Sequence, residues 1–233
     1  MAACHEGHKD VVKLLLEHSE RIDLNAKDNL GSTAFFDACY HGRKDVVQLL
    51  LNHSESIELN ARYYGWTAFI AACFNGHKDV VQLLLKYIRI ELNARDNGGT
   101  TAFTWACKNG HKDVVKLLLD HSEGIELNAR NYCRGWTAFK IACRYGQTDV
   151  VKLLLDHFER IDLNARYQIG TTAFIMACVN GDKNVVKLLL RRSERIEPNA
   201  RENDGWTAFM IACRYGHKDV VKLLLDMIKA KFG

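Results

Sequence analysis

This chain of 233 residues has a single proline, Pro198, and it lacks both long apolar segments and a large excess of either charge. No apolar run approaches the roughly 18 residues that would span a membrane. Met1 leads directly into the charged segment MAACHEGHKD, which lacks the apolar stretch of a signal peptide. We therefore expect no membrane partner, and an intracellular, cytoplasmic location.

The charges of the chain are nearly balanced. It carries 32 basic and 28 acidic residues, a net charge of +4. A protein that binds nucleic acid mainly through phosphate contacts needs a clearer basic excess, so we expect no nucleic-acid partner. Hydrophobic residues make up 48% of the chain, which is enough for an ordinary protein core.

Short motifs of common enzymes are absent as well. The chain contains no G-x-x-x-x-G-K-[ST], no G-x-G-x-x-G and no H-E-x-x-H. These motifs mark phosphate-binding loops, dinucleotide sites and zinc proteases. We therefore expect neither an enzyme nor a bound cofactor.

Cysteine is plentiful, but its spacing argues against disulfides. Cysteines that recur at a regular step occupy the same position in each of a series of stacked units. Stacked helices lie about 8–10 Å apart, whereas a disulfide needs Cα atoms within about 4.4–6.8 Å. The recurring cysteines of neighbouring units should therefore not form disulfides with one another. We expect free thiols and a reducing compartment. Catalysis by a cysteine would need a single thiolate with an oriented base, and a recurring cysteine is the opposite pattern. Cys133 is out of register, whereas seven cysteines recur at steps of 34 to 36 residues: Cys4, Cys39, Cys73, Cys107, Cys143, Cys178 and Cys213.

Internal repeats decide the fold class. The segment D-V-V-K/Q-L-L-L begins at Asp10, Asp45, Asp79, Asp113, Asp149 and Asp219, with the variant N-V-V-K-L-L-L at Asn184. The triplet T-A-F begins at Thr33, Thr67, Thr101, Thr137, Thr172 and Thr207. The triplet N-A-R, or N-A-K, begins at Asn25, Asn60, Asn93, Asn128, Asn164 and Asn199.

One unit predicts two helices and a hairpin. Thr67 can cap a short first helix through its hydroxyl, and Gly76 suits the left-handed turn that closes it. The second helix is expected over 78–86, with Asp79 in its first turn. Its valines and leucines cover most of its circumference, which indicates packing on more than one side. The remainder of a unit, such as the segment I-E-L-N-A-R-Y-Y-G-W over 57–66, is expected to form an extended arm and a hairpin tip that turns at Gly65.

These residues resemble the ankyrin repeat. The second unit reads N-A-K-D-N-L-G-S-T-A-F-F-D-A-C-Y-H-G-R-K-D-V-V-Q-L-L-L over residues 25–51, close to the family pattern. The resemblance implies an all-α repeat solenoid of about seven helix–turn–helix repeats with hairpin or finger loops, in one domain spanning 1–233. The expected repeats are 1–24, which is partial, and then 25–59, 60–92, 93–127, 128–163, 164–198 and 199–233.

The departures from the ankyrin pattern recur from unit to unit. Alanine replaces the proline of the family after each threonine. The histidine of the family, which bonds between repeats, is replaced by Phe36, Ile70, Thr104, Lys140, Ile175 or Met210. The resemblance also implies a possible substrate of an asparaginyl hydroxylase that favours a leucine eight residues before the hairpin asparagine, and Asn93 has Leu85 at that spacing.

Metal binding is the strongest competing chemistry. Cys73 and His77 are four residues apart, and three other units have the same spacing. Gly76 intervenes, the histidine slot holds other residues in the remaining units, and a structural zinc site needs four converging ligands. We therefore expect no metal, and buried cysteines each followed by a helix-starting residue.

A column of basic residues at the hairpins allows two interpretations: a structural brace for the next hairpin, or a basic stripe that meets an acidic partner. The sequence leaves both open. The column consists of Lys27, Arg62, Arg95, Arg130, Arg166 and Arg201.

Recognition is expected at the positions that vary between repeats, because the repeated positions hold a solenoid together. By resemblance these positions lie on the concave groove and finger tips, including the tip 167–169. Tryptophan, tyrosine and arginine dominate interface hot spots, and packing between repeats is the alternative role for the tryptophans. The candidate partner-binding residues are Tyr40, Tyr64, Trp66, Phe74, Trp105, Lys108, Trp136, Arg144, Tyr145, Trp206, Arg214 and Tyr215.

The sequence thus predicts a non-enzymatic protein-recognition module: a scaffold, adaptor or inhibitor. We expect a monomer whose binding patch centres on the fourth and fifth repeats, and a partner with an apolar segment flanked by acidic residues. The alternatives are a structural spacer within a larger protein, or an engineered repeat scaffold. The abrupt start suggests a fragment or an engineered chain, with a natural start also open. Because Asp182, Asn184 and Pro198 depart from the pattern, we expect the sixth-to-seventh junction to fray first.

Overall fold

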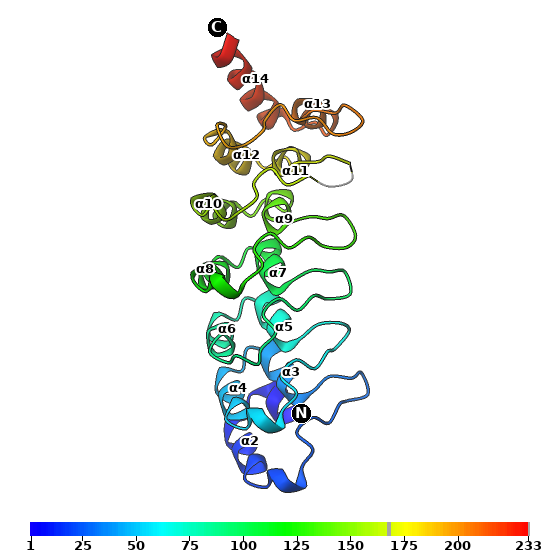
Figure 1. Ribbon diagram of the computed structural model, residues 1–233, viewed down its shortest axis with the longest axis vertical. Helices are drawn as coiled ribbons and strands as arrows, with labels where there is room; N and C mark the ends of the chain where they lie inside the picture. Colours follow the sequence, from blue (N-terminus) through cyan, green and yellow to red (C-terminus); the bar gives the residue numbers. More distant parts are fainter. Residues whose placement is uncertain (167–168, 233) are drawn as a thin grey trace. The chain divides into compact units, whose positions relative to one another are not determined.

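The computed structural model describes residues 1–166 and 169–232. The chain forms two compact units, which are described separately below. Unit 1 comprises Met1–Ala106 and Asp113–Glu126, and unit 2 comprises Cys107–Lys112 and Leu127–Gly233. Both are built from the same helix pair followed by a finger loop (Figure 1).

The helices confirm the predicted all-α repeat class. The first helices of the repeats are α1 (Ala2–Glu6), α3 (Ala34–Tyr40), α5 (Ala68–Phe74), α7 (Ala102–Asn109), α9 (Ala138–Arg144), α11 (Ala173–Asn180) and α13 (Ala208–Arg214). The second helices are α2 (Lys9–Leu16), α4 (Lys44–Leu51), α6 (Lys78–Leu84), α8 (Lys112–Asp120), α10 (Thr148–Asp156), α12 (Lys183–Leu190) and α14 (Lys218–Phe232). Three short 3-10 turns are η1 (Ser19–Arg21), η2 (Ser54–Ser56) and η3 (Ser122–Gly124).

Each first helix, apart from the partial α1, starts and stops where the sequence predicts. The hydroxyl of Thr67 accepts a hydrogen bond from the backbone N–H of Ile70 at 3.3 Å, which caps α5. Gly76 then turns the chain with a φ of 74°, a conformation that glycine adopts without steric cost. The same cap recurs at Thr33, Thr101, Thr137, Thr172 and Thr207.

The finger loops are short hairpins. An antiparallel bridge joins Tyr63 to Trp66 in one finger and Arg95 to Thr101 in the next. In unit 1, the residues between a second helix and the following arm form the 3-10 turns η1, η2 and η3. The fingers therefore protrude from the helix pairs at regular intervals within each unit (Figure 1).

Apolar side chains form the core between neighbouring helix pairs. In unit 1, α3 packs on α1 and α5, and α4 packs on α2 and α6; in unit 2, α11 packs on α9 and α13, and α12 packs on α10 and α14. The T-A-F phenylalanines are almost fully buried, with Phe69 and Phe139 each 1% exposed. Burying a side chain of this size stabilises the fold by roughly 1.5–3 kcal/mol.

The cysteines are all free thiols, as predicted. Six of the seven in-register cysteines are buried, whereas Cys133 is exposed. The expectation of burial is wrong for Cys213, which is exposed. Cys213 occupies the same position in its repeat as the buried cysteines. It is exposed because no further described repeat covers the first helix of the last repeat.

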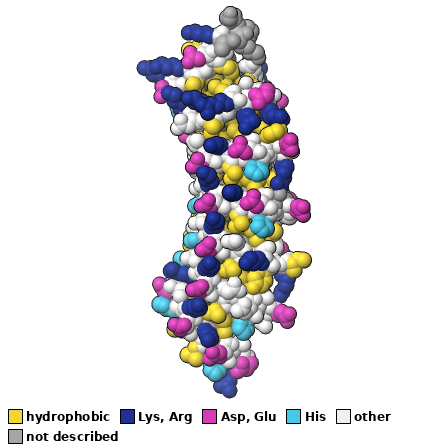
Figure 2. All heavy atoms as spheres, turned by 90° about the vertical axis from the view of Figure 1, so that its left-hand side faces the viewer, with side chains coloured by type: hydrophobic (Ala, Val, Ile, Leu, Met, Phe, Trp, Pro, Cys, Tyr) yellow, Lys and Arg dark blue, Asp and Glu magenta, His cyan; other side chains and the backbone are white. Residues whose placement is uncertain are grey.

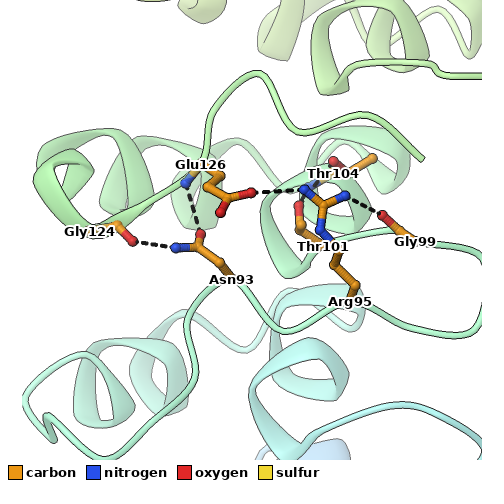
Figure 3. Close-up of polar contacts among 7 residues, drawn as sticks. All are labelled: Asn93, Arg95, Gly99, Thr101, Thr104, Gly124 and Glu126. Atoms are coloured by element: carbon orange, nitrogen blue, oxygen red, sulfur yellow. Dashed lines mark hydrogen bonds and ion pairs between the residues drawn. The ribbon is translucent and has the colours of Figure 1, made fainter. Parts of the chain in front are cut away.

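The first asparagine of a repeat bonds the arm that ends the same repeat. Asn93 donates from Nδ2 to the carbonyl of Gly124 at 2.8 Å, and its Oδ1 accepts from the backbone N–H of Glu126 at 2.8 Å (Figure 3). These bonds satisfy a backbone carbonyl and a backbone N–H for which the irregular turn supplies no hydrogen-bond partner. The same pair of bonds is made by Asn25, Asn60, Asn128 and Asn164.

The basic column serves largely as a brace between each finger and the arm that ends the same repeat. Arg95 forms an ion pair with Glu126 of the next arm and donates to the carbonyl of Gly99 in its own finger (Figure 3). The other pairs are Arg62 with Glu91, Arg130 with Asp162, and Arg166 with Glu197. Four members of the column are thus neutralised by acidic arms, which favours the structural interpretation over a free basic stripe.

Five of the six residues at the position that holds histidine in the family pattern are buried, and Met210 in the last repeat is exposed. Thr104 shares a hydrogen bond of 3.1 Å with Thr101. Lys140 is only 1% exposed. The pKa of Lys140 is lowered to about 8, mainly by burial and also by repulsion from Arg130, with Asp162 opposing both effects.

The second helices of the repeats present a mixed surface. Basic, acidic and apolar side chains are interspersed over much of this face (Figure 2). None of the helices in the described residues is both long and apolar enough to cross a membrane.

Candidate functional site

Unit 2 contains a pocket that several predicted recognition residues share. Its volume is about 240 Å³. Met176 and Ile211, each 5% exposed, contribute a buried apolar floor. The remaining lining residues are Arg134, Trp136, Arg144, Ile169, Val179, Glu202, Asp204, Trp206, Arg214 and Tyr215.

Two tryptophan–arginine pairs belong to the pocket wall. The guanidinium of Arg134 lies 5.1 Å from the centre of the Trp136 ring. Arg214 lies 5.1 Å from the centre of the Trp206 ring in the same way. A cation at this distance is attracted to the indole face, and the contact leaves the guanidinium N–H groups available to an acceptor.

The pocket arginines differ from the arginines of the finger column. Among the described residues, no carboxylate forms an ion pair with Arg134, Arg144 or Arg214, whereas Arg95 and Arg166 pair with acidic arms. A guanidinium can bind a carboxylate through two parallel hydrogen bonds. The pocket therefore offers unneutralised positive charge next to an apolar floor.

Two acidic residues also line the pocket. Glu202 accepts a hydrogen bond from the hydroxyl of Thr171, and Asp204 accepts from the backbone N–H of Trp206 at 3.4 Å. Both carboxylates have partners within their own region of unit 2. Their negative charge would influence how a bound group is oriented in the pocket. An anionic group is favoured beside the arginines and disfavoured beside Glu202 and Asp204.

Lys108 and Tyr145 form a separate contact in unit 2. The Lys108 ammonium lies 5.2 Å from the centre of the Tyr145 ring. The carbonyl of Lys108 accepts a hydrogen bond from Gln147 Nε2 at 2.7 Å. Tyr145 is 48% exposed, so its ring can still contact a ligand.

Unit 1 carries an aromatic cluster. Trp66 lies 4.7 Å from Phe74 and 5.3 Å from Trp105, and Phe74 lies 5.2 Å from Trp105, measured between ring centres. Trp105 Nε1 donates to Asp96 at 2.9 Å. The three rings are half-buried, so they pack between neighbouring repeats and also retain exposed surface.

The remaining predicted recognition residues of unit 1 are Tyr64 and Tyr40. Tyr64 is 70% exposed at its finger tip, with a φ of 47°. Tyr40 is 36% exposed, and its carbonyl accepts from His77 Nε2 at 2.8 Å. Tyr40 thus has a structural contact through its backbone and an exposed ring.

The structure brings together five of the predicted recognition residues in one pocket: Trp136, Arg144, Trp206, Arg214 and Tyr215. The site list from the sequence omitted Met176, Ile211 and Arg134, although each occupies a position that varies between repeats. It also missed Glu202 and Asp204, whose acidic character in the last finger was the available signal. Positions 167 and 168 of the predicted finger tip lie outside the described residues.

A metal site finds no support in the described residues. They contain no group of three or more histidine, cysteine, aspartate or glutamate side chains that could hold a metal ion. His77 instead contacts the Tyr40 carbonyl, and burial raises the pKa of the neighbouring Cys73 thiol. The Cys–His spacing is therefore part of the repeat packing.

Comparison with known proteins identifies the repeat. A family model described as ankyrin repeats (3 copies) matches residues 1–96, 55–131, 89–167 and 159–232. The crystal structure of the human ASB11 ankyrin repeat domain is similar in fold, with a TM-score of 0.77, 20% sequence identity and 95% of each chain covered. No curated protein matches the sequence. The family model spans almost the whole chain, and the chain belongs to the ankyrin repeat family.

Proposed function

We propose that this chain recognises a partner protein through the pocket of unit 2. Ankyrin repeats are generally non-catalytic modules for protein–protein interaction. The observation that carries the more specific proposal is the set of unneutralised arginines, Arg134, Arg144 and Arg214, beside an apolar floor. A scaffold, an adaptor and an inhibitor would all use such a surface.

The chemistry of the pocket favours one kind of partner segment. An apolar side chain of the partner would cover Met176 and Ile211 between the two indole rings. Aspartate or glutamate residues on either side of it would meet the guanidinium groups. Charge-assisted hydrogen bonds of this kind are about twice as strong as neutral ones, and their geometry would select acidic over basic flanks.

The leading alternative is a purely structural spacer, and an engineered scaffold is a further one. A spacer would need the asparagine bonds and the ion pairs that join fingers to arms. It would not need arginines that lie over tryptophan rings and form no ion pair among the described residues. The pocket is the feature that favours recognition over a spacer. The eight free thiols support a reducing, intracellular setting.

Photo-cross-linking tests this proposal. A photoreactive phenylalanine analogue replaces Tyr215 at the pocket rim or, as a control, the fully exposed Ile88 in unit 1. In cell lysate, the Tyr215 probe should link to a defined partner at an apolar segment with acidic neighbours. Trp136→Ala with Trp206→Ala should abolish that product while the helical circular dichroism stays unchanged. Equal products from both probes, or a product that survives the double substitution, would refute the pocket.

A modification site is proposed separately at Asn93. Its side-chain amide is hydrogen-bonded to Gly124 and Glu126 in the same way as the amides of the other arm asparagines are bonded to their partners. The feature that distinguishes Asn93 is Leu85, which lies eight residues earlier at the spacing that the hydroxylase favours. Mass spectrometry after incubation with an asparaginyl hydroxylase should find Asn93 modified first, and modification of Asn25 with Asn93 untouched would contradict this.

A further inference from the structure

The second helix of the sixth repeat, α12, differs in charge from the second helix before it. Residues 182–195, which cover α12 and the turn after it, include five basic and two acidic residues. The same positions of the fifth repeat, 147–160, include two basic and three acidic residues. Figure 2 shows lysine and arginine side chains gathered near the top of the second-helix face, at the level of α12 and α14. The sixth repeat thus departs locally from the mixed charge of this face.

Two acidic positions of the repeat are lost in α12. Asn184 stands where each of the other six repeats has aspartate. Arg191 stands where four of the other six have aspartate or glutamate. Asp182 explains why the helix tolerates the first change. Its carboxylate accepts from the backbone N–H groups of Asn184 and Val185, so it supplies the negative charge that favours a helix N-terminus.

Three basic side chains follow one side of α12. Lys183, Lys187 and Arg191 are four residues apart, and the backbone N–H of Arg191 still bonds the carbonyl of Lys187 as in a helix. Residues four apart are neighbours on a helix surface, and each such step advances about 6 Å along the axis. All three residues are exposed. Among the described residues none of the three forms an ion pair, whereas the adjacent Arg192 lies 3.6 Å from Asp156. We call these three residues the basic row.

The basic row costs the helix some stability, because like charges four residues apart repel one another on a helix surface. In unit 1 the lysine that corresponds to Lys183 lies near an aspartate of the following second helix. The distance is 3.8 Å from Lys9 to Asp45 and 3.7 Å from Lys44 to Asp79. The packing of the repeats therefore does not require an unpaired row, and its neutralisation is left to an external anion.

Mixed charge borders the basic row on both neighbouring helices. α12 packs on α10 and α14, and packed helices lie about 8–10 Å apart. Each of these two helices carries an exposed lysine between two exposed aspartates; the residues are Asp149, Lys152 and Asp156 on α10, and Asp219, Lys222 and Asp226 on α14. A membrane surface or a nucleic-acid duplex is wider than one helix and would cover these aspartates as well as the row. A single acidic segment would meet the row alone.

We propose that the basic row of α12 docks an acidic helix of a partner protein. The partner helix carries aspartate or glutamate at every fourth residue, because that spacing also advances about 6 Å and matches the row. Laid along α12, it would form one ion pair with each of Lys183, Lys187 and Arg191. Exposed ion pairs are individually weak, so this surface contributes more to the orientation and the rate of association than to the final affinity.

Fluorescence anisotropy with a stapled helical peptide tests the docking surface on the full chain. The peptide carries glutamate at every fourth position on an alanine background. It should bind, and its affinity should fall as salt is added, because exposed charges are screened. A peptide of the same composition in scrambled order should bind about tenfold more weakly, since fewer of its glutamates reach the row at once. Equal binding of both peptides would overturn the proposed spacing.

A variant that restores the residues of the other repeats gives the sharpest test. Asn184→Asp with Arg191→Asp places in α12 the aspartates that the fifth repeat carries as Asp149 and Asp156, so the variant suits the fold. It should weaken peptide binding about tenfold or more while the helical circular dichroism stays unchanged. Lys86→Asp is the matched control, because Lys86 is exposed at the position of Arg191 in the third repeat, and it should bind like the wild type. Undiminished binding by the double variant would overturn the inference.

Two further measurements separate this surface from other sites. The pocket of unit 2 is lined from first helices and fingers, so Arg144→Ala with Arg214→Ala should leave peptide binding unchanged. Loss of binding in that variant alone would place the peptide in the pocket and overturn the inference. Vesicles that contain phosphatidylserine, and duplex DNA, should bind more weakly than the peptide. Tighter binding of either would show that the row serves a lipid surface or a nucleic acid instead.

Discussion

The guanidinium of Arg95 lies 2.9 Å from the carboxylate of Glu126 in the arm that ends the same repeat. This contact gives the finger arginines a structural role. Arg144 occupies the pocket of unit 2 instead and has no ion pair among the described residues. The arginines therefore divide into those that brace a finger against an arm and those that line the pocket of unit 2.

Urea denaturation distinguishes these two roles. Arg95→Ala should lower the free energy of unfolding by up to about 1 kcal/mol, the size expected of an exposed ion pair with an added backbone bond. Arg144→Ala should leave the unfolding free energy within about 0.5 kcal/mol of the wild type. The reverse order of effects would show that the division is wrong.

Cysteine reactivity should follow burial. Cys133 and Cys213 are exposed and should react rapidly with an alkylating reagent under native conditions. Cys39, Cys73 and Cys143 should react slowly, because burial both blocks access and raises the pKa of each thiol. Peptide mapping after timed labelling provides the measurement. Equal labelling of all eight cysteines would contradict the packing between repeats.

The sequence was sufficient to predict the fold because each local signal agrees with the global arrangement. Thr67 caps a helix and Gly76 ends it, as their residue types require. The exposure of Cys213 could not be predicted from its slot in the repeat. Burial there depends on what packs against the repeat, and an identical slot does not carry that information.

Lys140 should make stability depend on alkaline pH. Its pKa is about 8 in the folded chain and 10.5 as the ordinary value. Between these values the unfolded chain binds more protons, so the free energy of unfolding rises with pH over this window. Below about pH 8 both forms are protonated, and the full penalty for burying the charged amine remains.

Lys140→Met supplies the control for this titration. Methionine occupies the same slot at Met210 and isoleucine at Ile70, so the variant suits the repeat. It should be more stable than the wild type at pH 7, by on the order of 3 kcal/mol at most, and the difference should shrink towards pH 10.5. A constant difference across this range would show that Lys140 does not titrate as described.

Asp182 should stabilise the helix that it begins. Its carboxylate accepts from the backbone N–H groups of Asn184 and Val185 at 2.8 and 3.1 Å, so a residue that looked irregular in the sequence is an N-cap. Asp182→Ala should cost about 1 kcal/mol. Asn184→Ala should cost little, because the Asn184 side chain is not the cap. Hydrogen exchange should show faster opening of α12 in the first variant only.

The position of the candidate pocket was less predictable than its residue types. The sequence indicated tryptophan and arginine at variable positions, and it centred the patch on the fourth and fifth repeats. The pocket that the structure contains joins residues of the fifth to seventh repeats, from Trp136 to Tyr215. Trp105 instead bonds Asp96 and packs on Trp66, contacts that depend on side-chain orientation and not on spacing.

Selection from a random-peptide display library tests the central claim most directly, because the library samples partner segments of every chemistry at once. The wild-type chain should enrich peptides with a large apolar residue flanked by aspartate or glutamate. Trp136→Ala with Trp206→Ala should weaken binding of those peptides at least thirtyfold, the loss expected for a central hot spot, while Ile88→Ala should bind them normally. Enrichment of basic peptides, or binding that survives the double substitution, would contradict recognition by the unit 2 pocket.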